Sequence, residues 1–299
     1  MRSALAIVLL VAACGGESAS DPDGGGPRDG DASPNGDGSP SIDAEPGEAP
    51  ISFVIEFDYR YDDAGFFDDP DRRATLEAAA AEWGRIFDQD FPTIADGTLI
   101  RTRDPEAPDD SGFNIEIDRD IDDLLVFVGC ANLDGPGGAT AKANHAAAIN
   151  SIADPTLRAQ LAARYRGPDF QPWTGWISFD CQESWFFDQT LDSDDDIPGT
   201  DSDFLSVAMH ELGHVLGFGT SDAFLELRSE DPWRFNGTAS VAEHGGSVPL
   251  SSSGFHLDSS LSSAGRETLM DPSRAGGTRT PPTPLDIAVL LDLGHDLVE

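Results

Sequence analysis

Three residues within one short segment, His210, Glu211 and His214, have the types and the spacing that metal-dependent chemistry needs. Two histidines four positions apart project from the same face of a helix, about one turn from each other. At that spacing both imidazoles can bind one zinc ion at about 2.0–2.1 Å. Glu211 stands next to the first histidine, where its carboxylate can take a proton from a zinc-bound water. The segment therefore predicts hydrolysis assisted by a single zinc ion.

The predicted reaction divides the work between the metal and the glutamate. Zinc would lower the pKa of its water from about 15.7 to about 7. Glu211 would accept the proton from that water and pass it to the leaving amine. The metal would then polarise the carbonyl and share the charge of the tetrahedral intermediate. The alternative is an ordinary amphipathic helix in which His210 and His214 are satisfied core histidines.

The helix that must carry these residues is predicted to run from Asp203 to Gly217. Ser202 or Asp203 can cap its start, and Gly217 can end it. Its apolar residues recur at helical spacing, which favours a helix packed against the protein interior. They are Phe204, Val207, Ala208, Leu212 and Val215.

The string from His210 to Gly219, His-Glu-Leu-Gly-His-Val-Leu-Gly-Phe-Gly, resembles the zinc-binding helix of metzincin proteases, the group that contains matrixins and leishmanolysin. In that group the glycine ends the helix and turns the chain towards a third ligand. The resemblance implies an α+β fold with a mixed twisted sheet, an active-site helix, and a smaller C-terminal lobe with a Met-turn and a C-terminal helix. It also implies a zinc metalloendopeptidase with protein or peptide substrates. It covers residues 173–299 well and residues 51–172 only loosely.

The third zinc ligand departs from the family pattern. A matrixin or astacin places it at the position of Thr220, which is not a zinc ligand, so it must come from further downstream, as in leishmanolysin. Leu-Met270-Asp-Pro resembles the metzincin Met-turn, in which a methionine packs beneath the zinc site. His256 lies nearer to Met270 than His244 does and is the predicted ligand, while His295, expected on the C-terminal helix, follows Met270 and is in the wrong order.

A gluzincin arrangement is the main alternative for the third ligand. It would place a downstream glutamate on a second helix, and Glu243 and Glu267 are the candidates. Neither stands in a recognisable helix, because glycines 245 and 246 and the serines around Ser251 interrupt the pattern. The histidine ligand is therefore favoured.

The start of the chain predicts export. A basic residue, Arg2, is followed by an apolar run too short to span a bilayer, which needs about 20 residues, so residues 1–14 resemble a signal peptide. Val-Ala-Ala-Cys14 resembles a bacterial lipobox, in which the cysteine becomes lipidated. The alternative is an ordinary signal peptide that happens to contain a cysteine. Gly15 in place of Asp leans, by analogy, to an outer-membrane or cell-surface lipoprotein of the cell envelope.

The domain division follows from composition. Residues 15–50 are rich in Gly, Pro, Ser and Asp, so they are expected to form a disordered acidic linker. Residues 51–299 are expected to fold as the metalloprotease domain, with an N-terminal lobe at 51–219 and a C-terminal lobe at 220–299. The net charge of −37 makes nucleic acid a poor partner. We expect a monomer that contacts the membrane only through its lipid anchor.

The rest of the domain is predicted to mix strands and helices. From Ile51 to Tyr61 apolar and polar residues alternate, which is the period of a half-buried strand. Asp69 and Pro70 predict the start of a helix that continues to about Phe87. The Gly- and Ala-rich segment 132–145 is expected to be a loop. Further strands are expected at 98–102, 113–118, 124–130 and 173–180, and a helix capped by Asp154 at 154–165.

Three smaller features allow two interpretations each. Cys130 and Cys181 form a disulfide in an exported protein, or remain two buried thiols; the disulfide is favoured. The acidic segment 192–203 is a solvated loop, or it binds a structural calcium ion. A set of aromatic residues forms core rather than a substrate cleft; its members are Trp173, Trp176, Trp185, Phe186 and Phe187.

Two classes of function remain open. The first is the endopeptidase, and the second is a non-catalytic surface lipoprotein that keeps the zinc-bound fold for adhesion or binding. Binding alone needs the ligands and not the base, so an intact Glu211 favours catalysis. A zinc hydrolase acting on something other than peptides has less support, because no phosphate-binding glycine loop is recognisable.

Overall fold

The computed structural model describes residue 51 and residues 53–89, 93–133, 139–146, 152–165 and 169–298. The predicted signal peptide at 1–14, the predicted lipidation site Cys14 and the predicted linker at 15–50 lie outside the described residues. Within the described ranges, no helix is both long enough and apolar enough to cross a lipid bilayer. All of these residues belong to the domain predicted for 51–299.

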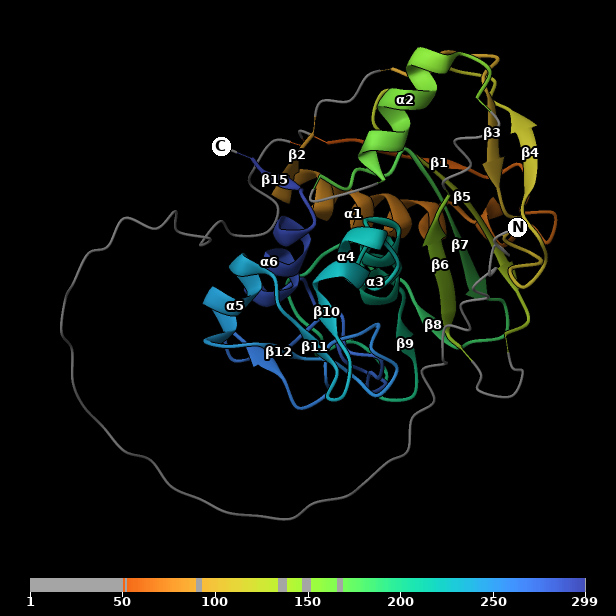
Figure 1. Ribbon diagram of the computed structural model, residues 1–299. Coiled ribbons are helices and arrows are strands. Elements are labelled where there is room, and N and C mark those ends of the chain that lie inside the picture. Colours follow the sequence, from red (N-terminus) through yellow and green to blue (C-terminus); the bar gives the residue numbers. More distant parts are fainter. Residues whose placement is uncertain are drawn as a thin grey trace, which may run out of the picture.

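A four-stranded mixed sheet forms the centre of the fold, with the strand order β1-β5-β7-β6 (Figure 1). β1 (Ile55–Asp58), β5 (Leu124–Ala131) and β7 (Thr174–Asp180) are parallel. β6 (Ala141–His145) runs antiparallel to β7 at one edge. β5 and β7 are buried along nearly their whole length. Strands buried on both faces need apolar side chains throughout, which explains the continuous apolar run at the start of β5.

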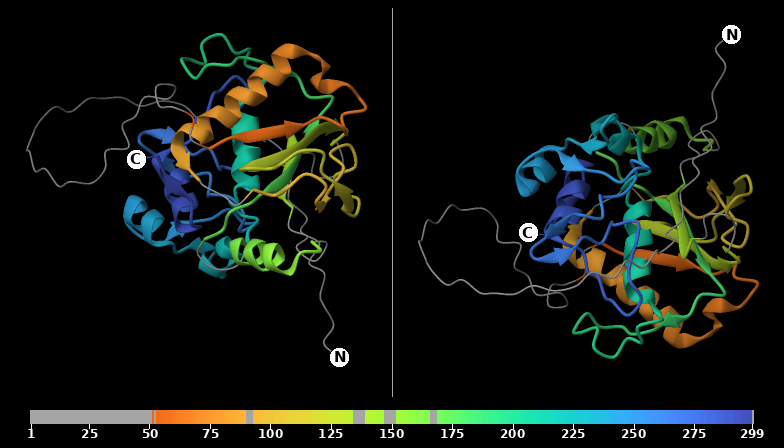
Figure 2. Two further views of the ribbon diagram at one scale, coloured as in Figure 1. Left: turned by 90° about the horizontal axis from the view of Figure 1, so that it is seen from above. Right: turned by 90° about the horizontal axis from the view of Figure 1, so that it is seen from below.

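Two long helices pack against each other beside this sheet (Figure 2). α1 (Pro70–Ile86) begins at the predicted cap, Asp69. α3 (Phe204–Val215) packs against α1 and also against β6 and β7. The indole of Trp83 in α1 donates a hydrogen bond to the carbonyl of Met209 in α3 at 3.0 Å. This buried contact fixes the position of α3 relative to the core.

The remaining elements are short. β10, β11 and β12 form a small three-stranded sheet, and the segment predicted as a C-terminal lobe, 220–299, holds the elements from α4 to β15. The short elements are η1 (Phe66–Asp68), β2 (Phe87–Asp88) paired with β15 (Asp296–Leu297), β3 (Leu99–Thr102) paired with β4 (Phe113–Glu116), α2 (Pro155–Arg164), β8 (Trp185–Phe186) paired with β9 (Ser202–Asp203), α4 (Asp222–Leu227), β10 (Arg228–Ser229), β11 (Arg234–Phe235), α5 (Thr238–His244), β12 (Val248–Pro249), β13 (Ser262–Ser263) paired with β14 (Arg266–Glu267), and α6 (Pro284–Asp292).

The mixed α+β fold class is confirmed, but the loop predicted at 132–145 is wrong in its second half. Its last five residues form the edge strand β6. Ala141 and Ala143 are buried, and pairing with β7 places them on one face of the sheet. Alanine has little strand propensity, so the sequence pattern gives no sign of this strand.

The strand predicted at 51–61 is shorter than expected. Only residues 55–58 pair with β5. The carboxylate of Asp58 accepts hydrogen bonds from the backbone nitrogen and the guanidinium of Arg60, and the chain turns at this point. Alternation of apolar and polar residues therefore continues beyond the end of the strand itself.

A disulfide links Cys130 in β5 to Cys181, which directly follows β7, with the Cα atoms 5.2 Å apart. The structure thus contains the bond that the sequence favours over two free thiols. Trp173 and Trp176 are buried, and the neighbouring Trp185 and Phe187 pack against the same core. These aromatic side chains support the sheet, as expected for core residues.

Candidate metal centre

The helix α3 presents His210 and His214 from a fully buried position. Its start is fixed by Asp203, whose carboxylate accepts a hydrogen bond from the backbone nitrogen of Ser206 at 3.2 Å. It ends at Val215, and the chain then leaves through Gly217, whose φ of +105° is costly for any residue with a side chain. The predicted cap at Asp203 is therefore confirmed, whereas the helix ends at Val215 with Leu216 as its C-cap, one residue before the predicted Gly217.

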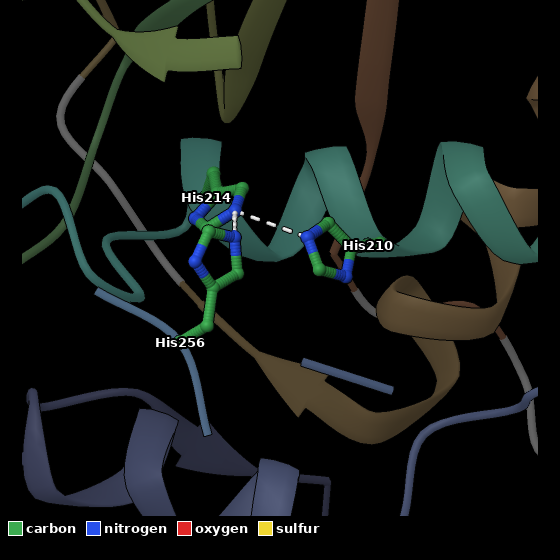
Figure 3. Close-up of side chains that lie close together, drawn as sticks. All are labelled: His210, His214 and His256. Atoms are coloured by element: carbon green, nitrogen blue, oxygen red, sulfur yellow. Dashed lines mark hydrogen bonds between the residues drawn. The ribbon is translucent and has the colours of Figure 1, made fainter. Parts of the chain in front are cut away.

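His210, His214 and His256 come together at one point (Figure 3). Nε2 of His214 lies 3.1 Å from Nε2 of His210 and 3.0 Å from Nε2 of His256. All three side chains are buried, with at most 4 % of their surface exposed. Within the described ranges this is the one group of three or more His, Cys, Asp or Glu residues that has the spacing to hold a metal ion.

The hydrogen bonds of His210 and His214 define which nitrogen of each ring faces the centre. Nδ1 of His210 lies 2.7 Å from the carbonyl oxygen of Leu269, and Nδ1 of His214 lies 2.7 Å from that of Phe218. A carbonyl oxygen only accepts, so each Nδ1 carries the hydrogen and each Nε2 keeps its lone pair. Lone pairs that face each other at about 3 Å repel, unless a cation lies between them.

The chemistry of the donor set fits zinc. Two nitrogens bound to one zinc ion at about 2.0–2.1 Å, at a tetrahedral angle, lie about 3.3–3.4 Å apart. The observed separations of 3.0 and 3.1 Å are within a few tenths of an ångström of that spacing. Burial lowers the pKa of His214 to about 4 and holds the pKa values of His210 and His256 well below their ordinary range. Neutral imidazole is the form that binds a metal.

His256 reaches the centre because two glycines allow a close approach. A Cβ on Gly219 would lie 2.2 Å from the carbonyl oxygen of Phe255, so only glycine fits where the chain leaves α3. Gly254 has a φ of +73° and lies against the ring of Trp233. Directly after His256, the backbone nitrogen of Leu257 donates to the carbonyl of Met270 at 2.9 Å. The chain is therefore positioned by a contact on each side of His256: Phe255 packs against Gly219, and Leu257 is hydrogen-bonded to Met270.

Glu211 lies beside this centre and faces a cavity. Only 6 % of its surface is exposed, and it lines the cavity together with His210. Burial raises the pKa of its carboxyl to about 8, and the positive charge of Arg274 offsets part of that effect. A carboxyl group with a pKa near neutrality can both take up and release a proton.

Met270 and Asp286 lie behind α3 and support it. Met270 is fully buried, and a Cβ on Gly213 would lie 2.7 Å from its sulfur. The carboxylate of Asp286 accepts hydrogen bonds from the backbone nitrogens of Leu269 at 2.9 Å and Met270 at 3.0 Å. Because the Leu269 carbonyl in turn accepts from His210, Asp286 acts through this peptide to orient the imidazole.

The other candidates for the third ligand lie elsewhere. His244 is exposed at the end of α5, where its Nδ1 lies 3.1 Å from the carbonyl oxygen of Gly246. Glu243 is in α5, so the expectation that it lies outside any helix is wrong, and its carboxylate accepts from Ser263. Glu267 is in β14. Neither glutamate belongs to the histidine cluster.

Two histidines, His295 and His145, lie in other parts of the fold than the sequence predicts. His295 follows α6 rather than lying in it, and its Nε2 donates to the carbonyl of Leu216 at 2.7 Å. His145, expected in a loop, ends β6 and packs against the ring of Phe170. The acidic segment 192–203 is mostly exposed, and the calcium ion considered for it stays a prediction.

Sequence reasoning missed Arg274 and Asp286. Asp286 had one readable signal, since it stands three residues after Thr283 and completes a capping box at the start of α6. That pattern indicates a helix start and gives no sign of contact with Leu269. Arg274 had no signal beyond its position shortly after Met270.

Comparison with known proteins supports a metallopeptidase. The sequence pattern of the matrixin family matches residues 159–227, which include α3 with His210 and His214 but stop before His256. No curated protein matches the chain. The matrixin match and the buried histidine cluster together support a zinc metalloprotease of the metzincin type, and the mixed sheet with its helices is compatible with a matrixin-like domain.

Proposed function

We propose that this protein is a zinc-dependent endopeptidase, with His210, His214 and His256 as metal ligands and Glu211 as the general base. The observation that carries the proposal is the convergence of three Nε2 atoms with Glu211 at the wall of an adjoining cavity. A zinc ion held by these nitrogens would supply a Lewis acid that makes water acidic and polarises a carbonyl group.

The residues of the chain have separate tasks in this proposal. Glu211 takes a proton and delivers it to the leaving amine, and its buried position keeps its proton affinity high. The carbonyls of Leu269 and Phe218 hold two imidazoles in the tautomer that leaves Nε2 free. Met270, as the methionine of a Met-turn, packs beneath α3 and limits its movement.

The edge strand β6 supplies a place for the substrate backbone. β6 pairs with β7 on one side, and among the described strands none pairs with its other side. Thr140 and Ala141 line the same cavity as Glu211. An extended peptide that adds to this edge by main-chain hydrogen bonds would pass the base and the metal ligands.

The first experiment measures zinc content and casein hydrolysis of the purified protein, with and without a chelator. We expect about one zinc per chain and activity that the chelator removes and zinc restores. Glu211→Gln should keep the zinc and lower hydrolysis by about 10²–10⁴-fold. Glu243→Gln, at an exposed glutamate outside the cluster, is the matched control and should change neither.

The same experiment separates this proposal from a non-catalytic role. A zinc-loaded protein that hydrolyses neither casein nor a broad peptide mixture would favour the surface-binding alternative. Unchanged turnover in Glu211→Gln would remove Glu211 from the mechanism.

We further propose, from the sequence of residues 1–50, that the protein is exported and anchored through a lipid on Cys14. The run Val-Ala-Ala-Cys and the linker that follows it support this placement. Mass spectrometry of the N-terminal peptide tests it. A mature terminus at any residue other than Cys14, or an unmodified Cys14, would contradict it.

A further inference from the structure

The cavity beside Glu211 has room for a small part of a substrate. It lies between α3 and the segment 271–275, and its volume is about 70 Å³. A bound water occupies about 10–15 Å³ on the same measure, so the cavity holds a few waters or one short side chain. Because His210 and Glu211 both line it, whatever enters lies directly next to the reacting bond.

The two aspartates in the cavity wall are held differently: Asp203 forms an ion pair, whereas Asp271 accepts hydrogen bonds from serine residues. Asp203 accepts hydrogen bonds from the Arg279 guanidinium and from Ser206. Asp271 is 3 % exposed, and its Oδ1 accepts from Ser259 and Ser273, while its Oδ2 is buried and has no hydrogen-bond partner. The oxygens of Asp203 are therefore occupied, and the unpartnered Oδ2 of Asp271 is buried away from a ligand in the cavity.

Arg274 is different, because its guanidinium is fixed but not neutralised by an ion pair. Its Nη2 donates to the carbonyl of Leu269 at 3.2 Å, the same oxygen that accepts from His210. Among the described residues, no carboxylate forms an ion pair with it, and its positive charge acts to lower the pKa of Glu211 and Glu267. Arg274 is partly exposed and lines the cavity, so we expect its remaining N–H groups to reach a ligand there.

We propose that Arg274 determines specificity by binding a carboxylate of the substrate next to the scissile bond. The inference rests on the proposed peptidase function. A planar guanidinium already held by a backbone carbonyl matches the two oxygens of a carboxylate, and little side-chain entropy remains to be lost. The carboxylate comes from an Asp or Glu side chain or from a free C-terminus.

This local preference acts against the field of the whole molecule. With a net charge of −37, the protein repels anionic peptides at long range. Salt removes most of that repulsion, since the Debye length falls to about 3 Å at 1 M, while a partly buried pair is screened much less. Measurements at high salt therefore isolate the contribution of Arg274.

The test is a cleavage-site profile of the full-length protein on a mixed peptide library, read by mass spectrometry at about 1 M salt. Matched peptides with Glu or Gln on either side of an identified site then give kcat/KM values. The variants are Arg274→Gln and Arg274→Glu, with Arg266→Gln as the control, because Arg266 is exposed and lies outside the cavity wall.

We expect the Glu peptide to exceed its Gln partner by about tenfold, which corresponds to about 1.4 kcal/mol of transition-state binding. Arg274→Gln should abolish this ratio without loss of zinc, Arg274→Glu should reverse it in favour of Gln, and Arg266→Gln should keep it. A peptide with a free C-terminus at the same position can replace the Glu side chain as the source of the carboxylate. Faster cleavage of that peptide than of its C-terminal amide would show that Arg274 binds the carboxylate of a chain end.

Two results would overturn the inference. One is an Arg274→Gln variant that loses activity equally on Glu and Gln peptides, which would mean a structural role through Leu269. The other is a wild-type protein with no preference, or with a preference for Lys, at 1 M salt.

A binding measurement separates this inference from the peptidase proposal. Fluorescence anisotropy of the same peptides on Glu211→Gln needs no turnover. If the wild type cleaves no peptide, the proposed peptidase function is wrong. Tighter binding of the Glu peptide than of the Gln peptide, lost in a variant without Arg274, would still support carboxylate recognition. Equal binding of both peptides would overturn it.

Discussion

Replacing His256 tests the assignment that depends most on the fold. His256→Ala removes a buried imidazole whose Nε2 lies 3.0 Å from that of His214. His244→Ala is the control, because His244 carries the same side chain but is exposed and contacts a backbone oxygen of Gly246. We expect the first variant to lose zinc and hydrolysis, and the second to keep both.

The size of the effect follows from linkage between zinc binding and folding. Zinc at 100 times its dissociation constant stabilises the folded protein by about 2.7 kcal/mol. Loss of a neighbour that merely orients a ligand weakens metal binding by about 10–100-fold, so loss of a ligand should weaken it by about 100-fold or more. At the same zinc concentration the remaining stabilisation is about 0.4 kcal/mol or less. Since 1 kcal/mol shifts Tm by about 2–4 °C in a domain of this size, the zinc-induced rise in Tm should shrink by about 5–9 °C.

The assay is thermal unfolding of each variant with and without zinc, together with metal analysis. Comparing each variant with its own metal-free form removes the cost of deleting the side chain. If His244→Ala lost the zinc-induced rise and His256→Ala kept it, His244 would be the ligand. If both variants kept it, neither histidine would be the third ligand and the metzincin assignment would weaken.

Three further predictions concern the frame around the centre. Replacing Cys130 and Cys181 by Ser should lower the unfolding free energy by about 3–4 kcal/mol, because the bond closes a long loop. The measurement is denaturant unfolding, and the same unfolding free energy in the double variant and the oxidised wild type would contradict this prediction. Burial lowers the pKa of His295 to about 4, so its contribution to stability is present above pH 6.5 and falls as the pH drops towards 4. The loss of unfolding free energy between pH 7 and pH 5 should therefore be about 2 kcal/mol smaller in His295→Gln, and equal losses would refute the argument. Asp286→Asn turns an acceptor into a donor against the backbone of residues 269 and 270, so it should cost on the order of 3 kcal/mol and weaken zinc about 10–100-fold, and a variant with wild-type zinc affinity would show that Asp286 does not orient His210.

The central helix could be predicted because its signals are local. A cap at Asp203, a helical apolar period and the glycine at 217 all lie within one segment, and the structure begins the helix at the predicted cap. The choice of His256 rested on its distance from Met270 along the chain. The structure brings His256 to the other two histidines and pairs Leu257 with Met270.

The features that could not be predicted depend on contacts between distant segments. β6 is a strand only because β7 pairs with it, and its alanines carry no pattern that separates a strand from a loop. Asp286 reaches Leu269 across the fold, although its local sequence indicates only a helix start. Arg274 becomes a candidate for substrate recognition only once the cavity beside Glu211 is known.

The long spacing between His214 and His256 also finds a physical account. The backbone oxygen of Phe255 lies so close to Gly219 that a Cβ there would clash with it, so residues 220–254 leave the end of α3 and return to the same place. These residues form α4, α5 and the three-stranded sheet β10-β11-β12. An insertion whose two ends meet costs little in chain entropy and leaves the surrounding geometry unchanged. The matrixin match ends at residue 227, inside this excursion. In the proposed metal site, His256 would therefore stand in for the ligand that matrixins have at the position of Thr220, without any change in the helix that carries the other two histidines.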